Sequence, residues 1–214
     1  MIKNINDFCL LFSKQMFTKQ TTLKILNFFT SKIDDSFSLR SVGRNINMNP
    51  SLVHRSIQPL FKEKILKRDK HKNISLNYKS DVEVLSYSEY LRREDFLTKK
   101  ENVEIKLFRN EILGKIDLES FVLILFGSAV ETNDFRDIDI LLIVKDNVEF
   151  YDKFLENISS NYSLPFECRV INYESVYEML SKRNERNIIN ELLNKHIILS
   201  GGELFYSLLK RGRR

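Results

Sequence analysis

Two short apolar runs in the second half of the chain most constrain its fold. They are Val122–Phe126 and Ile138–Val144, and each meets polar residues at one end. Apolar runs of five to seven residues predict buried strands. They are far shorter than the roughly 20 residues of a membrane-spanning helix, so we do not expect the chain to be an integral membrane protein. The runs therefore predict a sheet with polar side chains gathered where the two strands meet.

Two aspartates open the second run. Asp137 and Asp139 are two residues apart, and positions i and i+2 share one face of a strand. Such a pair of like charges calls for a counter-charge, and Mg²⁺ typically takes one or two carboxylates together with substrate phosphates. At the end of the first run, Gly127 lets the backbone approach a ligand and Ser128 can hold phosphate oxygens. The pattern favours phosphoryl chemistry, with a solvated strand end as the alternative.

This Gly-Ser, spacer, Asp-x-Asp arrangement between two apolar strands resembles the DNA polymerase beta-like nucleotidyltransferase superfamily, particularly its minimal prokaryotic and archaeal members. The following segments have the same order: a helix over residues 148–158, a strand over Phe166–Asn172 and a helix that opens at Tyr173. The close of the chain, Ile197–Phe205, is also similar to the end of these domains. The resemblance covers about residues 101–209.

The resemblance implies a two-metal nucleotidyltransferase that uses ATP or another nucleoside triphosphate. A third carboxylate completes the metal site in that family, and the matching position here is Glu167, with an ordinary exposed strand residue as the alternative and Glu174 as a less favoured substitute. The implied metal ligands, for two Mg²⁺ ions, and catalytic residues are Asp137, Asp139 and Glu167. The implied nucleotide-binding residues are Gly127, Ser128 and Arg136.

Two departures from the family pattern affect the phosphate loop. The spacer between Ser128 and Asp137 is shorter than usual and lacks its customary glycine, and Arg136 stands where a serine is typical. Arg136 either contacts phosphate or marks a site that has drifted from catalysis. We expect transfer of AMP to a hydroxyl of a protein or small molecule, with an antitoxin-like role toward a toxin partner as one form. The alternatives are a nucleotide-sensing regulator with little turnover and an inactive scaffold.

The chain has a basic half and an acidic half. Residues 1–80 carry 15 Lys and Arg against 5 Asp and Glu, whereas residues 81–214 carry 19 against 24. A strongly positive segment next to a negative one is typical of a nucleic-acid-binding module joined to another domain. The alternative is a solvated, lysine-rich face.

The basic half reads as helices followed by a hairpin. Apolar spacing predicts a helix near residues 22–31, a short helix after the N-cap Ser38, and another that opens at Asn49 and Pro50. Pro59 predicts a kink in that last helix. Residues 65–76 read as a hairpin with a basic tip.

This order resembles the winged helix-turn-helix domain of bacterial and archaeal regulators, over residues 18–79. The resemblance implies a recognition helix at residues 50–62, a wing at residues 67–72, double-stranded DNA as partner, and a homodimer. Winged helices also serve as dimerisation or protein-binding modules, which is the alternative. The implied DNA contacts are Ser51, His54, Arg55, Gln58, Lys62, Lys67, Arg68, Lys70 and Lys72.

The expected fold class is α+β. The expected parts are a winged helix-turn-helix domain at 1–80, a helical connector at 81–115, a small mixed α/β nucleotidyltransferase-like domain at 116–209 and a disordered basic tail at 210–214. The N-terminus lacks the apolar core of a signal peptide, and Cys9 and Cys168 look like packing residues, so we expect a cytoplasmic protein. His54, His71 and His196 are far apart in the sequence, which disfavours a zinc site.

Overall fold

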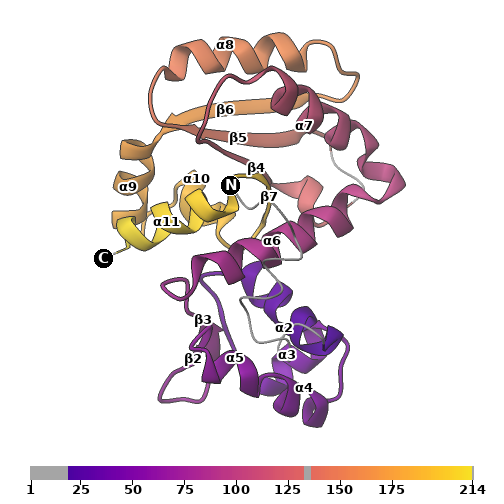
Figure 1. Ribbon diagram of the computed structural model, residues 1–214, viewed down its shortest axis with the longest axis vertical. Helices are drawn as coiled ribbons and strands as arrows, with labels where there is room; N and C mark the ends of the chain where they lie inside the picture. Colours follow the sequence, from indigo (N-terminus) through magenta and orange to yellow (C-terminus); the bar gives the residue numbers. More distant parts are fainter. Residues whose placement is uncertain (1–18, 133–135, 214) are drawn as a thin grey trace. The chain divides into compact units, whose positions relative to one another are not determined.

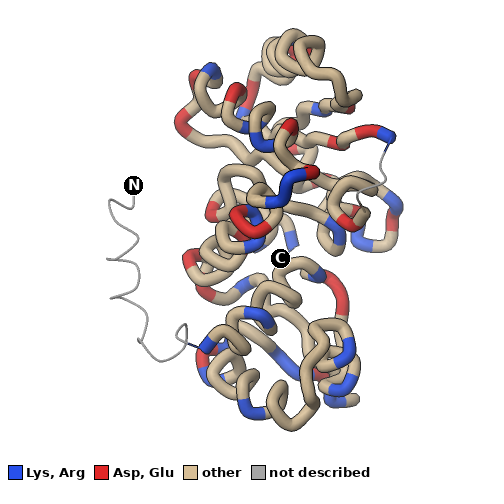
Figure 2. Tube along the Cα trace, turned by 90° about the vertical axis from the view of Figure 1, so that its right-hand side faces the viewer, with Lys and Arg blue, Asp and Glu red and all other residues tan. Residues whose placement is uncertain are grey.

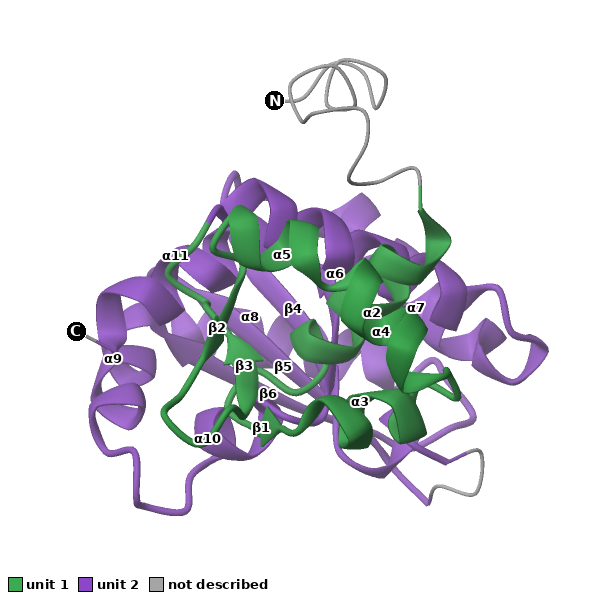
Figure 3. Cartoon of the chain, turned by 90° about the horizontal axis from the view of Figure 1, so that it is seen from below, with its two compact units in different colours: residues 1–80 green, residues 81–214 purple. Residues whose placement is uncertain are grey.

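The computed structural model describes residues 19–132 and 136–213, and its elements divide between two compact units (Figures 1 and 3). The first unit spans Met1–Ser80 and the second spans Asp81–Arg214. Each unit contains helices and a sheet, so the chain is of the α+β class, as the sequence predicted. Among the described residues, no helix has both the length and the apolar character needed to cross a bilayer.

In its described part, the first unit consists of four helices and a small sheet. The helices are α2 (Gln20–Thr30), α3 (Leu39–Asn45), α4 (Pro50–Ser56) and α5 (Gln58–Lys62). The strands are β1 (Ser36–Phe37), β2 (Leu66–Arg68) and β3 (Ile74–Leu76), in the antiparallel order β1-β3-β2. Helix α2 buries Ile25, Leu26 and Phe29 completely, and this helical spacing gives the unit its core. The sequence predicted the β2–β3 hairpin but not β1.

Short-range hydrogen bonds set the turn between α3 and α4 where the sequence predicted it. The Ser38 hydroxyl accepts a hydrogen bond from the backbone N–H of Ser41 at 3.2 Å, which caps α3. Asn47 has a left-handed φ of 52° in the turn. The side-chain oxygen of Asn49 then accepts from the N–H of Ser51 at 2.9 Å, which caps α4. The predicted helix starts are thereby confirmed.

Pro59 interrupts the helix that follows this turn. Helix α4 ends at Ser56, and α5 begins at Gln58. A proline within a helix lacks the N–H donor, and its ring clashes with the carbonyl four residues earlier. The kink is therefore confirmed, and the single helix expected over residues 50–62 is two short helices.

The second unit is organised around a four-stranded mixed sheet among its described residues. The strands are β4 (Val122–Phe126), β5 (Ile138–Val144), β6 (Phe166–Asn172) and β7 (His196–Ser200), in the order β6-β5-β4-β7. Strand β4 is antiparallel to both β5 and β7, whereas β5 and β6 are parallel. Every residue of β5 except Asp139 is buried, which explains why its sequence is a nearly continuous apolar run.

Six α-helices and two 3₁₀ turns accompany this sheet in the described part of the unit. They are α6 (Val82–Leu97), η1 (Lys100–Asn102), α7 (Val103–Lys115), η2 (Ser128–Val130), α8 (Val148–Ser159), α9 (Tyr173–Ser181), α10 (Ile188–Leu192) and α11 (Gly202–Gly212). Residues 81–115 are helical, as expected, but they do not form a separate connector. Helix α6 packs on α11 and β7, and Phe108 of α7 stacks on Phe166 of β6 with ring centroids 3.9 Å apart.

Arginines from α6 and α7 bind the outer edge of the sheet. Strand β7 is at the edge of the sheet, and no other described strand pairs with its outward carbonyl groups. The guanidinium of Arg92 donates to the carbonyl of His196 at 2.6 Å, and that of Arg109 donates to the carbonyl of Leu199 at 2.8 Å. These two helices therefore supply donors to two backbone carbonyl groups of the edge strand.

The basic end of the chain differs from the expected disordered tail at 210–214. Helix α11 continues through Gly212, and the side chain of Arg213 is buried, with 2% exposure. Arg214 lies outside the described residues. The last turn of α11 carries Lys210 and Arg211, which are cations at the negative end of the helix dipole. The expectation was wrong because the preceding apolar residues of α11 anchor this segment to the core.

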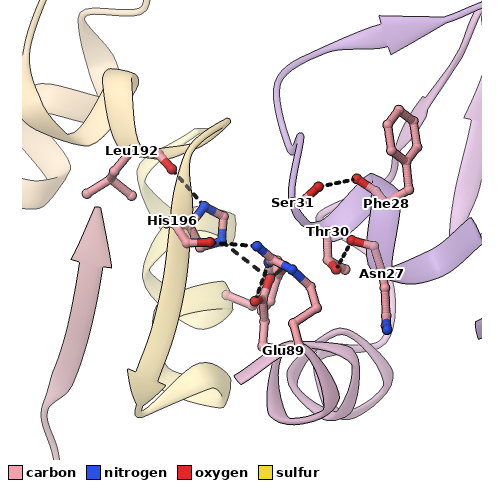
Figure 4. A network of polar contacts seen from close by, with 9 residues as sticks. Asn27, Phe28, Thr30, Ser31, Glu89, Leu192 and His196 are labelled. Atoms are coloured by element: carbon pink, nitrogen blue, oxygen red, sulfur yellow. Dashed lines mark hydrogen bonds and ion pairs between the residues drawn. The ribbon is translucent and has the colours of Figure 1, made fainter. Parts of the chain in front are cut away.

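A buried carboxylate joins α6, β7 and α11. Glu89 Oε1 accepts a hydrogen bond from the Tyr206 hydroxyl at 2.8 Å, and Glu89 Oε2 is 2.5 Å from Arg92. Glu89 Oε1 also lies 3.4 Å from His196 Nε2 (Figure 4). His196 Nδ1 donates to the carbonyl of Leu192 at 2.7 Å, because a carbonyl oxygen can only accept. Burial alone would raise the pKa of Glu89, but the charge of Arg92, with His196 and Tyr206, lowers it below its ordinary value.

We expect Glu89→Ala to lower the free energy of unfolding of the second unit by about 3–5 kcal/mol, because it removes the partner of a buried cation. The contribution of Glu89 also depends on pH. Since the folded pKa is lowered, the stabilisation is present above the ordinary value of 4.5 and is lost as the pH falls through the lower folded value. Urea unfolding of the wild type and Glu89→Gln at neutral pH and below 4.5 measures this contribution.

The difference in the free energy of unfolding between the wild type and Glu89→Gln should become smaller as the pH falls. Glu83→Ala is the matched control, because Glu83 is exposed on the same helix. It should change the free energy of unfolding by no more than about 0.5 kcal/mol. An identical acid dependence in the wild type and Glu89→Gln would contradict the assignment.

Candidate functional site

Strand register brings three of the predicted site residues to one end of the sheet. In the antiparallel pair, Phe126 of β4 lies opposite Asp139 of β5, so Gly127 follows directly beside this aspartate. In the parallel pair, Asp139 lies opposite Glu167 of β6. Neighbouring strands are about 4.8 Å apart, and directly paired side chains share a face. Asp139 therefore stands between Gly127 and Glu167.

Gly127 makes room for the Asp139 carboxylate. Its φ is 77°, a left-handed conformation that residues with a Cβ rarely adopt. A Cβ added at this position would also overlap Oδ2 of Asp139. The backbone thus passes against the carboxylate with no side chain between them. This close approach explains why a glycine is required at position 127.

Negative charge is concentrated around Asp139. Partial burial raises the pKa of its carboxyl group, and the charges of Asp137 and Glu167 raise it further. The positive charges of Arg169 and Lys195 act in the opposite direction but do not cancel the effect. A carboxylate with a raised pKa among other carboxylates is stabilised by an additional cation. This electrostatic environment is the kind found at functional sites.

The donor set fits Mg²⁺ only in part. Among the described residues, no three His, Cys, Asp or Glu side chains are grouped closely enough to hold a metal ion on their own. Asp137 and Asp139 are half-buried, whereas Glu167 is exposed. Mg²⁺ is usually held by one or two carboxylates, with water and substrate phosphates as the other ligands. The two aspartates fit that role, and Glu167 is the nearest candidate for a third ligand.

The predicted phosphate loop begins at η2. The carbonyl of Ser128 accepts hydrogen bonds from the N–H groups of Glu131 and Thr132, at 3.0 and 3.1 Å. This turn holds the backbone after Gly127 in a tight curve. Arg136 is exposed directly before Asp137. Residues 133–135, between Thr132 and Arg136, lie outside the described part of the chain.

A cavity of about 530 Å³ opens beside Gly127 and Asp139. Its walls come from β4, β5, β6 and the segment from α10 to β7. The charged residues in its lining are Asp139, Arg169, Arg186, Glu191 and Lys195. The cavity thus combines a carboxylate suited to a metal ion with cations suited to phosphate. Both are parts that a nucleotide-binding site requires.

Lys195 and Arg186 are site residues that sequence reasoning missed. Lys195 reaches the site because β7 is antiparallel to β4, with His196 paired to Phe126. No local sequence signal reveals this pairing, since the two strands are about 70 residues apart in the chain. Arg169, two residues after Glu167 on β6, also lines the cavity.

The first unit presents the predicted polar face to solvent. All five side chains of this face are exposed, and they are divided between α4 and α5: Ser51, His54, Arg55, Gln58 and Lys62. The side chain of Gln58 donates to the carbonyl of His54 at 2.9 Å, across the break between the helices. Figure 2 marks the Lys and Arg positions of the described chain in blue. The face is therefore accessible and polar.

The hairpin tip is held in shape by one aspartate. Asp69 Oδ1 accepts hydrogen bonds from the N–H groups of His71 and Asn73, both at 2.8 Å. The cations on this hairpin are all exposed: Lys67, Arg68, Lys70 and Lys72. The guanidinium of Arg68 also lies 4.8 Å from the ring centre of Phe61. This contact joins the hairpin to α5.

The described cysteine is a packing residue, as the sequence predicted. Cys168 packs against the core of the second unit, and burial, together with the charge of Asp152, raises the pKa of its thiol to about 12. A thiol with so high a pKa is a poor nucleophile. Cys9 lies outside the described residues.

We expect Gly127→Ala to destabilise the second unit by about 1–3 kcal/mol and to displace the Asp139 carboxylate, because the new Cβ requires both strain and space. Gly114→Ala is the matched control. Gly114 is in helix α7 with no atom within 4 Å of an added Cβ, so alanine should stabilise by up to about 1 kcal/mol. Thermal unfolding of both variants checks the signs. Equal effects would contradict the special role of position 127.

Each unit contains its own group of candidate functional residues. In the second unit they are a glycine, carboxylates and cations around one cavity. In the first unit they are an exposed polar face and a basic hairpin. Comparison of the chain with protein-family models, curated proteins and solved structures found no match.

Proposed function

We propose that the second unit is a Mg²⁺-dependent nucleotidyltransferase of the DNA polymerase beta-like type. The observation that carries the proposal is the strand register that sets Gly127, Asp139 and Glu167 side by side at the edge of a cavity containing cations. The mixed sheet order supports it as well. The proposed reaction transfers AMP from ATP to a hydroxyl of a protein or small molecule: the acceptor oxygen bonds to the α-phosphorus, the bond between the α- and β-phosphates breaks, and pyrophosphate leaves. A partner protein is the leading acceptor.

In this proposal, Asp137 and Asp139 hold Mg²⁺, with Glu167 as the third carboxylate. A metal ion held by these residues would supply charge neutralisation at the phosphates and a lower pKa for the attacking hydroxyl. Gly127 brings backbone N–H groups close to the triphosphate, and Ser128 adds a hydroxyl donor. Arg169 contributes positive charge to the same cavity. The chain thus catalyses by positioning and charge complementarity, with no covalent enzyme intermediate.

We expect Asp139→Asn to reduce nucleotidyl transfer by at least about 100-fold, since it removes a metal ligand and leaves the shape of the side chain unchanged. The measurement incubates purified protein with cell lysate, Mg²⁺ and ATP labelled at the α-phosphate, and follows label on protein and small molecules. Asp95→Asn is the control, because Asp95 is exposed on α6 and carries the same charge. Equal labelling by wild type and Asp139→Asn would rule out the proposed chemistry.

A second function, DNA binding, is favoured by the first unit. We propose that it is a winged helix-turn-helix domain, with α4 facing the major groove and the β2–β3 hairpin contacting phosphates. The exposure of all nine predicted contact residues and the excess of 15 cations over 5 anions in residues 1–80 support this. A protein with both activities could control its own synthesis. A regulator whose second unit only senses nucleotide would bind Mg²⁺-ATP without releasing pyrophosphate.

We expect simultaneous replacement of the four hairpin cations by alanine to weaken binding to random duplex DNA. The slope of log affinity against log salt should fall by about 0.9 for each phosphate that the variant no longer neutralises. Mobility shifts at several salt concentrations measure both effects. The replaced residues are Lys67, Arg68, Lys70 and Lys72.

The control replaces four exposed lysines of the second unit. They are Lys99, Lys100, Lys106 and Lys153. This variant has the same net charge as the hairpin variant, so it separates local phosphate binding from a general decrease in positive charge. If both variants weaken binding equally, the hairpin is not the phosphate-contacting element.

A further inference from the structure

An ion pair lies beside the proposed nucleotide site. Lys195 Nζ lies 3.0 Å from Glu131 Oε2. Glu131 directly follows η2, the turn that begins with Ser128 in the predicted phosphate loop. Lys195 directly precedes β7, whose first residue pairs with Phe126. The pair therefore joins the two chain segments that flank Gly127.

Lys195 also lines the cavity, together with Gly127, Asp139 and Arg169. Its charge acts on the Asp139 carboxylate and opposes the rise in pKa that burial and the neighbouring carboxylates cause. The ammonium group is thus within electrostatic reach of both a proposed metal ligand and the phosphate loop.

Because this ion pair is exposed, Lys195 can readily exchange Glu131 for another anion. The side chains of Lys195 and Glu131 are 36% and 48% exposed. An exposed ion pair typically changes an equilibrium constant by about fivefold at most, because water solvates both partners. Lysine carries its charge on a flexible stem with three donor hydrogens, so it can turn from a carboxylate to another anion nearby. A phosphate, with greater negative charge, is the stronger partner.

We propose that Lys195 binds the phosphates of the nucleotide and that Glu131 competes with them for the same ammonium group. This inference rests on the proposed function of the site, and it adds a phosphate-binding residue that the sequence motif does not contain. Its consequence is specific. The two members of one ion pair must have opposite effects on nucleotide affinity.

The experiment measures the dissociation constant of Mg²⁺-ATP by titration calorimetry for Lys195→Gln and Glu131→Gln. We expect Lys195→Gln to weaken binding by about tenfold, which is the scale of one charge-assisted hydrogen bond. Glu131→Gln should tighten binding by about two- to fivefold, because it releases the ammonium group. Lys195→Arg should keep most of the affinity. Thermal unfolding first establishes that each variant is folded.

The controls come from a similar ion pair on α9. Lys182 Nζ lies 2.8 Å from Glu178 Oε1, and both side chains are exposed outside the cavity. Lys182→Gln and Glu178→Gln match the test variants in charge and should leave the affinity unchanged.

The possible results separate this inference from the function on which it rests. Wild-type affinity in both test variants would overturn the role of Lys195 and leave nucleotide binding intact. Weaker binding in Glu131→Gln would overturn the competition, because Glu131 would then be positioning the lysine. No binding of Mg²⁺-ATP by the wild type would overturn both the nucleotide site and this inference.

Discussion

The hydrogen-bond ladder of strand β5 is the constraint on which the candidate site depends. Strand β5 pairs with β4 on one side and β6 on the other, and Asp139 takes part in both registers. A shift of either register by one residue would turn the carboxylate to the opposite face of the sheet. All other residues of β5 are buried, so such a shift would move the charged Asp139 into a buried position, which costs the solvation of its carboxylate. Burial of the strand thereby fixes the position of its charged residue.

Helices α6 and α7 contribute more to the second unit than a connection would. They supply core residues such as Phe108, and they supply the guanidinium groups that bind the carbonyls of the edge strand β7. One of these cations, Arg92, is also the partner of the buried carboxylate Glu89. Lys195 is next to that network in the chain, so the position of a cavity residue depends on the same packing.

Local patterns in the sequence predicted the helices and strands, but they did not predict the pairing of strands that are distant in the sequence. The bounds of β4 and β6 and the caps at Ser38 and Asn49 were predicted, because apolar runs and capping side chains act over a few residues. The presence of Lys195 in the cavity was missed, since it follows from the β4–β7 register. The 81–115 segment was read as a connector because it is helical in pattern and rich in charged residues, whereas the core contacts of side chains such as Phe108 depend on packing against the distant sheet.

The arginine contacts to β7 have a consequence for dividing this protein into fragments. A fragment that starts at residue 116 would retain the sheet but lack the groups that bind the carbonyls of His196 and Leu199. Its edge strand would then offer unpaired carbonyl groups to other chains, which is a common route to aggregation. A fragment for independent expression therefore has to include α6 and α7, and the division between the two compact units, between Ser80 and Asp81, meets that requirement.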